Sequence, residues 1–281
     1  MIIFLINYMK IKNLTNNVKE YLSGLDIIGE IAIIKIKEIY IPHKNQIGNL
    51  VIDNFHNVKS VFLQESSVEG EYRLKKLSYL SGINNSVTLY RESGCNFLLD
   101  VTKVYFSPRL SSERLRIAKL VNSNEKILNM FAGVSPFSII ISKYNKNCQI
   151  VDIELNPSAC IFAKENYSLN KINNIVSICG DSKSIIKEKF NNTFDRILMP
   201  LPENSIDFLE DAIFAINKNG GWIHLYSHIN CNEDNVLECA SSILNSKISN
   251  YGEIKFLRIV KHIGPGWYQI VFDIKVNKKI D

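Results

Sequence analysis

The stretch KILNMFAGVSPF, from Lys126 to Phe137, decides the fold together with QIVDIELNP, from Gln149 to Pro157. The first stretch is typical of a strand, a glycine-containing turn and a helix, and the second of a strand that ends in an acidic residue. In a βαβ unit, the turn lets backbone N–H groups approach a ligand, and an acid at the end of the second strand can bind a ribose diol. This combination predicts a site for a nucleoside cofactor.

The turn after the first strand distinguishes between cofactors. A dinucleotide site uses three glycines in G-x-G-x-x-G, whereas the turn here has one, Gly133, followed by Pro136. S-adenosylmethionine has no phosphate and needs a close backbone approach, an acid for the ribose and an adenine pocket. Gly133, Glu154 and Asp181 supply these in chain order. Each also has a structural alternative: Gly133 ends a strand, Glu154 is a solvated acid, and Asp181 caps the next helix.

Strands and helices alternate from Glu125 onward, which predicts a parallel sheet covered on both faces. The last two strands flank the turn His262–Gly266 and predict an antiparallel hairpin at one sheet edge. The predicted fold class is therefore α/β, with a doubly wound, Rossmann-like sheet and a C-terminal antiparallel hairpin, an arrangement that resembles the usual architecture of class I methyltransferases. The other predicted strands are 126–130, 149–153, 175–179, 195–199 and 220–229, and the predicted helices are 136–144, 156–170, 182–190, 205–216 and 234–244.

The part of the chain before this sheet is β-rich and predicts a small α+β domain. A helix is expected to follow it, with Ser111 or Ser112 as its N-cap. The strands expected in the small domain are 27–36, 60–66 and a pair within 86–100 around Ser93 and Gly94. The predicted divisions are an N-terminal segment at 1–25, the small α+β domain at 26–100 and the α/β domain at 101–281.

The composition indicates a soluble globular protein, since 46% of the residues are hydrophobic and 22% are charged. The formal charge of +5 permits a polyanionic partner without requiring one. Basic residues gather between Lys103 and Lys119, where the only acid is Glu113. This segment is consistent either with phosphate contacts or with a solvated helix face, and charge alone does not separate the two.

The six cysteines, at 95, 148, 160, 179, 231 and 239, show no C-x-x-C spacing. We therefore expect no metal site and no disulfide framework, and most thiols are expected to be small core residues. The apolar N-terminus, MIIFLINYMKIKN, is too short to span a bilayer and lacks a basic n-region and a cleavage site, so a cytoplasmic protein is expected. Met9 is an alternative start to Met1.

Seven segments together form a specific pattern. They are GEYRLKK (70–76), DVTKVYFSPRLSSER (100–114), MFAGVSPFSI (130–139), LNP (155–157), ENYSLNK (165–171), GDS (180–182) and DRILMPLP (195–202). From about Asp26 to its end, the chain resembles the archaeal and eukaryotic tRNA (guanine-37 N1)-methyltransferase family, which shares its catalytic fold with the wybutosine-synthesis transferases. The extra N-terminal domain with which many family members grip the tRNA elbow is expected to be absent.

The resemblance implies methylation of N1 of guanosine at tRNA position 37, with S-adenosylmethionine as the cofactor. Guanine N1 carries a proton at neutral pH, so this reaction needs a general base and a group that stabilises charge on O6. Glu113 matches the family's base, and Arg73 matches its charge-stabilising arginine. The structural alternatives are an ion pair between Glu113 and Arg116 for the first and a surface cation for the second.

The remaining site residues also follow from the resemblance or from their place in the predicted turn. A stacking role is considered for Tyr105 and Phe106, although an aromatic pair in an apolar strand is more often core. No metal is expected. The predicted cofactor-binding residues are Phe131, Ala132, Gly133, Glu154, Asn156, Asp181, Tyr105 and Arg109, and the predicted substrate-binding residues are Pro200, Leu201, Pro202, Arg116 and Lys103.

Three positions depart from the family pattern: Asn129 replaces an aspartate, Ser135 a glycine, and Pro200 an asparagine. Proline at position 200 resembles the branch that methylates a tricyclic wyosine precursor at the same tRNA position. Guanine methylation is the leading interpretation, and three alternatives stay open: that tricyclic substrate, aminocarboxypropyl transfer, and a noncatalytic tRNA-binding protein. The expected partner is the anticodon stem-loop of tRNA, gripped by the small domain and the basic helix, with no membrane or stable protein partner and a monomeric chain.

Overall fold

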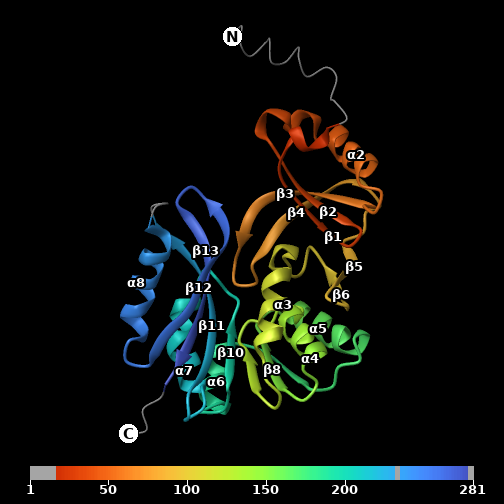
Figure 1. Ribbon diagram of the computed structural model, residues 1–281. Coiled ribbons are helices and arrows are strands. Elements are labelled where there is room, and N and C mark those ends of the chain that lie inside the picture. Colours follow the sequence, from red (N-terminus) through yellow and green to blue (C-terminus); the bar gives the residue numbers. More distant parts are fainter. Residues whose placement is uncertain (1–16, 232–234, 278–281) are drawn as a thin grey trace. The chain divides into compact units, whose positions relative to one another are not determined.

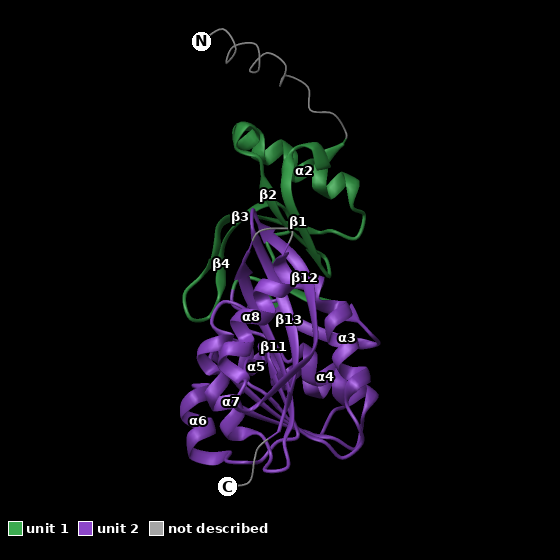
Figure 2. Ribbon diagram, turned by 60° about the vertical axis from the view of Figure 1, so that its left-hand side comes forward, with its two compact units in different colours: residues 1–90, 100–102 green, residues 91–99, 103–281 purple. Residues whose placement is uncertain are grey.

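The computed structural model describes residues 17–231 and 235–277. It separates into two compact units, one of residues 1–90 with 100–102 and the other of residues 91–99 with 103–281 (Figure 2). The alternative start Met9 and most of the predicted N-terminal segment lie outside the described residues. No helix in the described ranges is both long and apolar enough to cross a membrane.

The first unit contains a four-stranded sheet in the order β1-β2-β3-β4, where β2 and β3 run parallel and the other neighbours antiparallel. The run 27–36, predicted as one strand, is a hairpin of β1 and β2, because Gly29 adopts the left-handed conformation with φ of +57°. Ile47 and Val51, one helical turn apart on α2, pack onto the sheet. The bounds are β1 Leu22–Ile28, β2 Ile31–Ile36, α2 Lys44–Asn54, β3 Ser60–Glu69 and β4 Leu74–Gly82, with 3-10 turns at Val18–Glu20 and Glu38–His43.

A strand pair follows and confirms the hairpin predicted around Ser93 and Gly94. Its strands are β5, Val87–Glu92, and β6, Cys95–Asp100.

The second unit contains a seven-stranded sheet in the order β12-β13-β11-β10-β7-β8-β9 (Figure 1). The strands β7 to β11 pair in parallel, whereas β13 pairs antiparallel with β11 and with β12. The predicted doubly wound sheet with an antiparallel hairpin at one edge is thus confirmed. The strands are β7 Lys126–Asn129, β8 Gln149–Glu154, β9 Ile175–Cys179, β10 Arg196–Met199, β11 Gly221–Asn230, β12 Gly252–Gly264 and β13 Trp267–Val276.

Helices cover both faces of this sheet. Figure 2 shows α3 and α4 on one side and α6, α7 and α8 on the other. Burial on both faces explains the continuous apolar strands, of which Leu128, Ile153 and Ile197 are fully buried. The helices are α3 Ser111–Leu120, α4 Pro136–Tyr144, α5 Pro157–Leu169, α6 Ser182–Lys189, α7 Leu209–Ala215 and α8 Val236–Ile248, with 3-10 turns at Pro108–Leu110 and Ser205–Phe208.

Two expectations about this unit are wrong. Neither Ser111 nor Ser112 is the N-cap of α3: Leu110 occupies that position and makes no side-chain cap. Four of the six cysteines also pair, as Cys160–Cys179 and Cys231–Cys239, while Cys95 and Cys148 are free and buried. Cys160 lies at the start of α5 and Cys179 at the end of β9, and the parallel pairing of β8 with β9 brings these ends together although 19 residues separate them. Spacing in the sequence does not reveal such a long-range pair.

Candidate functional site

The predicted cofactor loop connects β7 to α4. Gly133 has a φ of +57°, and its N–H donates a hydrogen bond to Glu154 Oε2 at 2.7 Å. A Cβ added at this position would meet a single atom within 4 Å, the carbonyl oxygen of Tyr105 at 3.9 Å. Glycine therefore serves two purposes here: it permits the positive φ, and it leaves the backbone open toward a ligand.

The cofactor loop is anchored by a buried carboxylate, that of Asp152 on β8. This carboxylate accepts hydrogen bonds from the hydroxyls of Ser135, Ser138 and Tyr167, the last at 2.7 Å. Burial raises the pKa of the Asp152 carboxyl, and the three donors oppose that effect. Ser135 has a φ of +67°, so this chain places a serine in a conformation that favours glycine and anchors it through its hydroxyl. The other departure, Asn129, donates to Ser138 at 3.0 Å.

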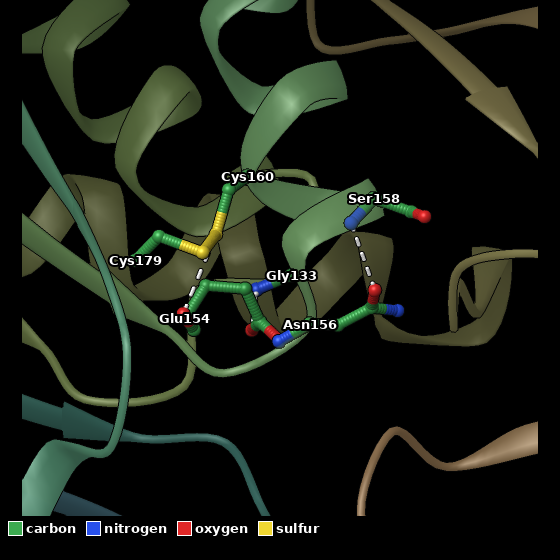
Figure 3. The surroundings of a disulfide bond; sticks show 6 residues. All are labelled: Gly133, Glu154, Asn156, Ser158, Cys160 and Cys179. Atoms are coloured by element: carbon green, nitrogen blue, oxygen red, sulfur yellow. Dashed lines mark hydrogen bonds between the residues drawn. A yellow bond between two sulfur atoms is a disulfide. The ribbon is translucent and has the colours of Figure 1, made fainter.

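Glu154 ends β8 beside the loop (Figure 3). Its second carboxylate oxygen accepts a hydrogen bond from the backbone N–H of Asn156 at 2.8 Å, and its carbonyl accepts one from Gly180 at 2.8 Å. The Cys160 sulfur, part of the disulfide with Cys179, lies 3.3 Å from the same carbonyl oxygen. Burial raises the pKa of the Glu154 carboxyl. The acid predicted to bind ribose is therefore fixed in position by contacts on three sides.

Asn156 and Asp181 both cap helices. The Asn156 side chain accepts a hydrogen bond from Ser158 N at 2.9 Å and donates one to the Lys103 carbonyl at 2.8 Å. The Asp181 carboxylate accepts from the backbone N–H and the hydroxyl of Ser184, at 2.9 and 2.7 Å, and these bonds lower its pKa. The structural alternative considered for Asp181 is thus present, and its exposed position still leaves an edge for a ligand.

A pocket lies within the second unit, between the segment before α3, the cofactor loop and the end of β10. Five of the predicted site residues line it: Tyr105, Phe131, Ala132, Gly133 and Pro200. Five residues that the sequence analysis predicts for the site therefore line the same pocket.

Of the other predicted residues, Glu154, Asn156 and Asp181 are not among those that line the pocket. Arg109 and Lys103 are exposed and do not line the pocket. Phe106 does line it, but its ring is largely buried and packs against Phe97 and the Arg114 guanidinium. Of the Pro200–Pro202 turn, Leu201 accepts a hydrogen bond from Ser205 N, and Pro202 accepts one from His228 N. These two carbonyls shape the loop.

Glu113 projects from the first turn of α3 and has no exposed surface. Its Oε2 accepts hydrogen bonds from Arg116 Nε and the Tyr226 hydroxyl, both at 3.1 Å. Its Oε1 forms an ion pair with the Arg258 guanidinium and accepts no hydrogen bond from the other described residues. The next residue, Arg114, forms a bidentate pair with Glu92 at 2.5 and 2.6 Å.

Arg116 is fixed by a second carboxylate, Asp273 on β13. Two hydrogen bonds of 2.6 and 3.0 Å join them, and Asp273 also contacts His224 Nδ1 at 2.6 Å. The Arg196 guanidinium lies 2.5 Å from His224 Nε2 and can only donate, so Nδ1 carries the proton that bonds to Asp273. Although burial opposes it, hydrogen bonds from His224 and Arg116 lower the pKa of Asp273 to about 2.

The sequence did not identify Asp273, Tyr226, Arg258 or Asp152. Asp273 and Arg116 are 157 residues apart, and only the sheet order brings them together. A charged residue within an apolar strand, such as Asp273 in WYQIVFDIKV, is the one signal that could have marked it. Arg73 lies in the turn between β3 and β4 with a φ of +55° and belongs to the first unit, whereas Glu113 belongs to the second.

Comparison with known proteins identifies two matching domain families. The TRM5/TYW2 methyltransferase domain matches residues 88–249, and the TYW2 N-terminal domain matches residues 8–86.

Three relatives illustrate the similarity. The chain is 37% identical to tRNA (guanine(37)-N(1))-methyltransferase Trm5b of Pyrococcus abyssi, over 96% of this chain and 80% of that protein, and the crystal structure of that wild-type Trm5b gives a TM-score of 0.79 over the same shares. It is 36% identical to tRNA 4-demethylwyosine(37)-methyltransferase Taw21 of Saccharolobus solfataricus, over 90% of this chain and 94% of that protein. The structure of Methanocaldococcus jannaschii Trm5 in complex with adenosine gives a TM-score of 0.77 at 32% identity, over 93% of this chain and 76% of that one.

Proposed function

Because the chain belongs to the TRM5/TYW2 methyltransferase family, we propose that it transfers the methyl group of S-adenosylmethionine to N1 of guanosine at tRNA position 37. The observation that carries this proposal is the pocket in which Gly133 opens the backbone beside Tyr105 and Pro200. A phosphate-free nucleoside suits such a pocket, since its loop has one glycine and no pyrophosphate cradle.

The residues present fit the cofactor. Gly133 offers open backbone, Glu154 ends the neighbouring strand as an acid, and Tyr105 and Phe131 line the pocket with aromatic surface. We assign Glu154 to the ribose, the Gly133 loop to the methionine part and Asp181 to the edge of the adenine. Asn156 shapes the site through its cap on α5. When bound, S-adenosylmethionine supplies an electrophilic methyl group on a sulfonium.

The chain's own residues provide the acid–base chemistry. Glu113 removes the proton from guanine N1, which frees the nitrogen lone pair to form the new N–C bond. Arg73 stabilises the negative charge that develops on O6. Arg116 holds Glu113 in place, since Asp273 anchors its guanidinium. Glu113 has no exposed surface, so the proton does not pass to bulk water at this site.

A second substrate, 4-demethylwyosine at the same position, is favoured by one specific observation. Pro200 lines the pocket at the end of β10 and has no side-chain donor or acceptor for a guanine edge. The similarity to Taw21 extends over 94% of that protein. We therefore propose guanosine as the first substrate and the tricyclic base as the second.

The small α+β domain, residues 26–100, is proposed to bind the anticodon stem-loop together with the exposed Lys103 and Arg109. Since its proposed substrate is tRNA, we propose that the enzyme acts as a monomer in the cytoplasm.

Transfer of a labelled methyl group to tRNA transcripts tests the proposal. A transcript with guanosine at position 37 is compared with one that has adenosine there and is otherwise identical. Label on the first transcript alone is the expected result, because adenine N1 has no proton to remove and adenine has no O6. Equal labelling of both transcripts would overturn the assignment to position 37.

A further inference from the structure

The environment of Glu113 poses a problem for its proposed role. A general base must bring a lone pair within hydrogen-bond distance of the proton that it removes. Glu113 has no exposed surface, and both of its oxygens contact other side chains. One of the groups that cover the carboxylate must therefore leave before guanine N1 can reach it.

Two of the three covering groups are held in place. The Tyr226 side chain on β11 is 1% exposed, and its ring packs against Phe137 with centroids 5.8 Å apart. Arg116 is fixed by its bidentate bond to Asp273, and its guanidinium lies over the Phe256 ring at 4.9 Å. Moving either group would break buried polar contacts or core packing, which is costly.

Arg258 differs from both. It lies on β12, the edge strand of the sheet, and 46% of its side chain is exposed. It contacts Glu113 at Oε1, and no other described residue donates a hydrogen bond to that oxygen. If Arg258 withdraws, Oε1 becomes an open acceptor while Oε2 keeps both of its hydrogen bonds.

We propose that Arg258 is an exchangeable counter-ion, which covers Glu113 in the free enzyme and moves to a backbone phosphate when RNA binds, so that Oε1 becomes free to accept the N1 proton. This inference rests on the proposed function and identifies Arg258 as a positioning residue that couples RNA binding to exposure of the base. The phosphate replaces the carboxylate as the anion for Arg258, so no charge is left without a partner.

The exchange also makes the Glu113 carboxylate a stronger base. Glu113 faces Arg116 from its own helix, Arg258 from β12 and the Tyr226 hydroxyl from β11, and Asp273 on β13 offsets the charge of Arg116. Removing one of two cations makes a carboxylate a stronger base. In the step that follows, the proton of N1 moves to Oε1, the electron pair of the N–H bond becomes available at N1, N1 bonds to the methyl carbon, and the C–S pair stays on sulfur.

The test uses the full chain with Arg258→Gln, with Arg258→Lys as the conservative variant. Lys255→Gln is the matched control, because Lys255 is an exposed cation on the same strand that pairs with Glu253 and not with Glu113. The single-turnover rate of methylation of a guanosine-37 transcript is measured from pH 5.5 to 8.5. One pH profile is taken at an enzyme concentration too low to saturate the transcript (the sub-saturating profile), and a second at a concentration that saturates it (the saturating profile). Transcript affinity is measured between about 50 and 200 mM salt. S-adenosylmethionine affinity by calorimetry verifies that each variant is folded.

The proposal predicts four results for Arg258→Gln. Transcript affinity falls about 3- to 10-fold, and the slope of log K against log salt decreases by about 1. The acid limb of the sub-saturating profile moves about one pH unit upward, because the free enzyme has lost a cation beside the base. The saturating profile keeps the wild-type midpoint, because Arg258 has already left Glu113 in the complex. Arg258→Lys restores most of the salt slope.

Two results would overturn the proposal. In the first, Arg258→Gln leaves the slope of log K against log salt unchanged and moves the acid limbs of the sub-saturating and saturating profiles by the same amount. Arg258 would then stay on Glu113 throughout the reaction. Unchanged limbs in both profiles would mean that Arg258 does not influence the base. If the wild-type enzyme methylates no transcript while the salt slope still depends on Arg258, the proposed function fails and the phosphate contact stands.

Discussion

The hydroxyl of Ser135 donates a hydrogen bond to the carboxylate of Asp152, a side chain that is only 1% exposed beneath the cofactor loop. This bond compensates for the left-handed backbone of Ser135, with φ of +67° and ψ of +35°. The chain thus keeps, with a serine, a turn that glycine would form without strain.

Replacing Ser135 by alanine or by glycine separates the two effects. Ser135→Ala keeps the unfavourable φ and loses the hydrogen bond to a buried carboxylate, so we expect a loss of about 1–3 kcal/mol in the free energy of unfolding and weaker S-adenosylmethionine binding. Ser135→Gly loses the bond but removes the strain, so its loss should be smaller. Urea unfolding and calorimetry measure both. Equal losses in the two variants would show that backbone strain plays no part.

Gly133→Ala should weaken the cofactor site specifically. The substitution costs about 1 kcal/mol of stability through its positive φ and places a methyl group where the backbone is open to the ligand. Gly94→Ala is the matched control: Gly94 has a φ of +71°, an added Cβ would meet nothing within 4 Å, and it lies in the β5–β6 turn. We expect similar unfolding midpoints for both variants and at least a tenfold loss of S-adenosylmethionine affinity only for Gly133→Ala. Equal affinities would place the cofactor elsewhere.

Glu113→Gln should separate chemistry from cofactor binding. The amide keeps the size of the side chain but cannot take the N1 proton, so the single-turnover rate should fall about 10²- to 10⁴-fold. S-adenosylmethionine affinity should stay within about twofold, because Glu113 does not line the cofactor pocket. Glu253→Gln, an exposed acid on β12, serves as the control for the lost charge. A large loss of cofactor affinity in Glu113→Gln would refute its assignment as the base.

His224 should make stability depend on pH. Burial lowers the pKa of His224 below its ordinary value, so the folded state resists protonation and its stability falls as pH drops below about 6.5. His224→Asn keeps a donor for Asp273 at the Nδ1 position, places no acceptor at the Nε2 position that faces Arg196, and cannot be protonated. The variant should be about 1–2 kcal/mol less stable than wild type at pH 7.5, and the gap should shrink at pH 5.5. Urea unfolding at both pH values measures the gap; a constant gap would mean that His224 does not titrate differently in the two states.

The α/β unit could be predicted from the sequence because its elements carry strong local signals. Its strands are continuous apolar runs, and proline or glycine follows each of β7, β8, β9 and β10, so every predicted strand from Lys126 onward lies within about two residues of its expected place. The edge hairpin was equally clear from the two long runs around Gly264 and Gly266.

The first unit was harder to predict. In β4, Leu74, Leu77 and Leu80 recur every three residues, a spacing that does not fit strand alternation, so the sequence does not predict this strand. The helix α2 was missed as well, since its amphipathic signal rests on Ile47, Val51 and few other apolar residues.

The residues of the candidate site also differ in how well the sequence predicts them. Gly133, Tyr105 and Pro200 were found from local motifs, and they line one pocket. Two of the three partners of Glu113, Tyr226 on β11 and Arg258 on β12, lie more than 100 residues away in the sequence, so only the three-dimensional pairing of strands reveals them. A polar network of this kind leaves no local pattern.

The most direct test of the central claim is nucleoside mass spectrometry of tRNA after incubation of the purified protein with methyl-labelled S-adenosylmethionine. Two tRNAs are compared, one with guanosine at position 37 and one with the tricyclic 4-demethylwyosine. Labelled N1-methylguanosine from the first tRNA is the predicted result. Product from the tricyclic substrate alone, or a transferred aminocarboxypropyl group in place of methyl, would contradict the claim that this chain is a guanosine-37 methyltransferase.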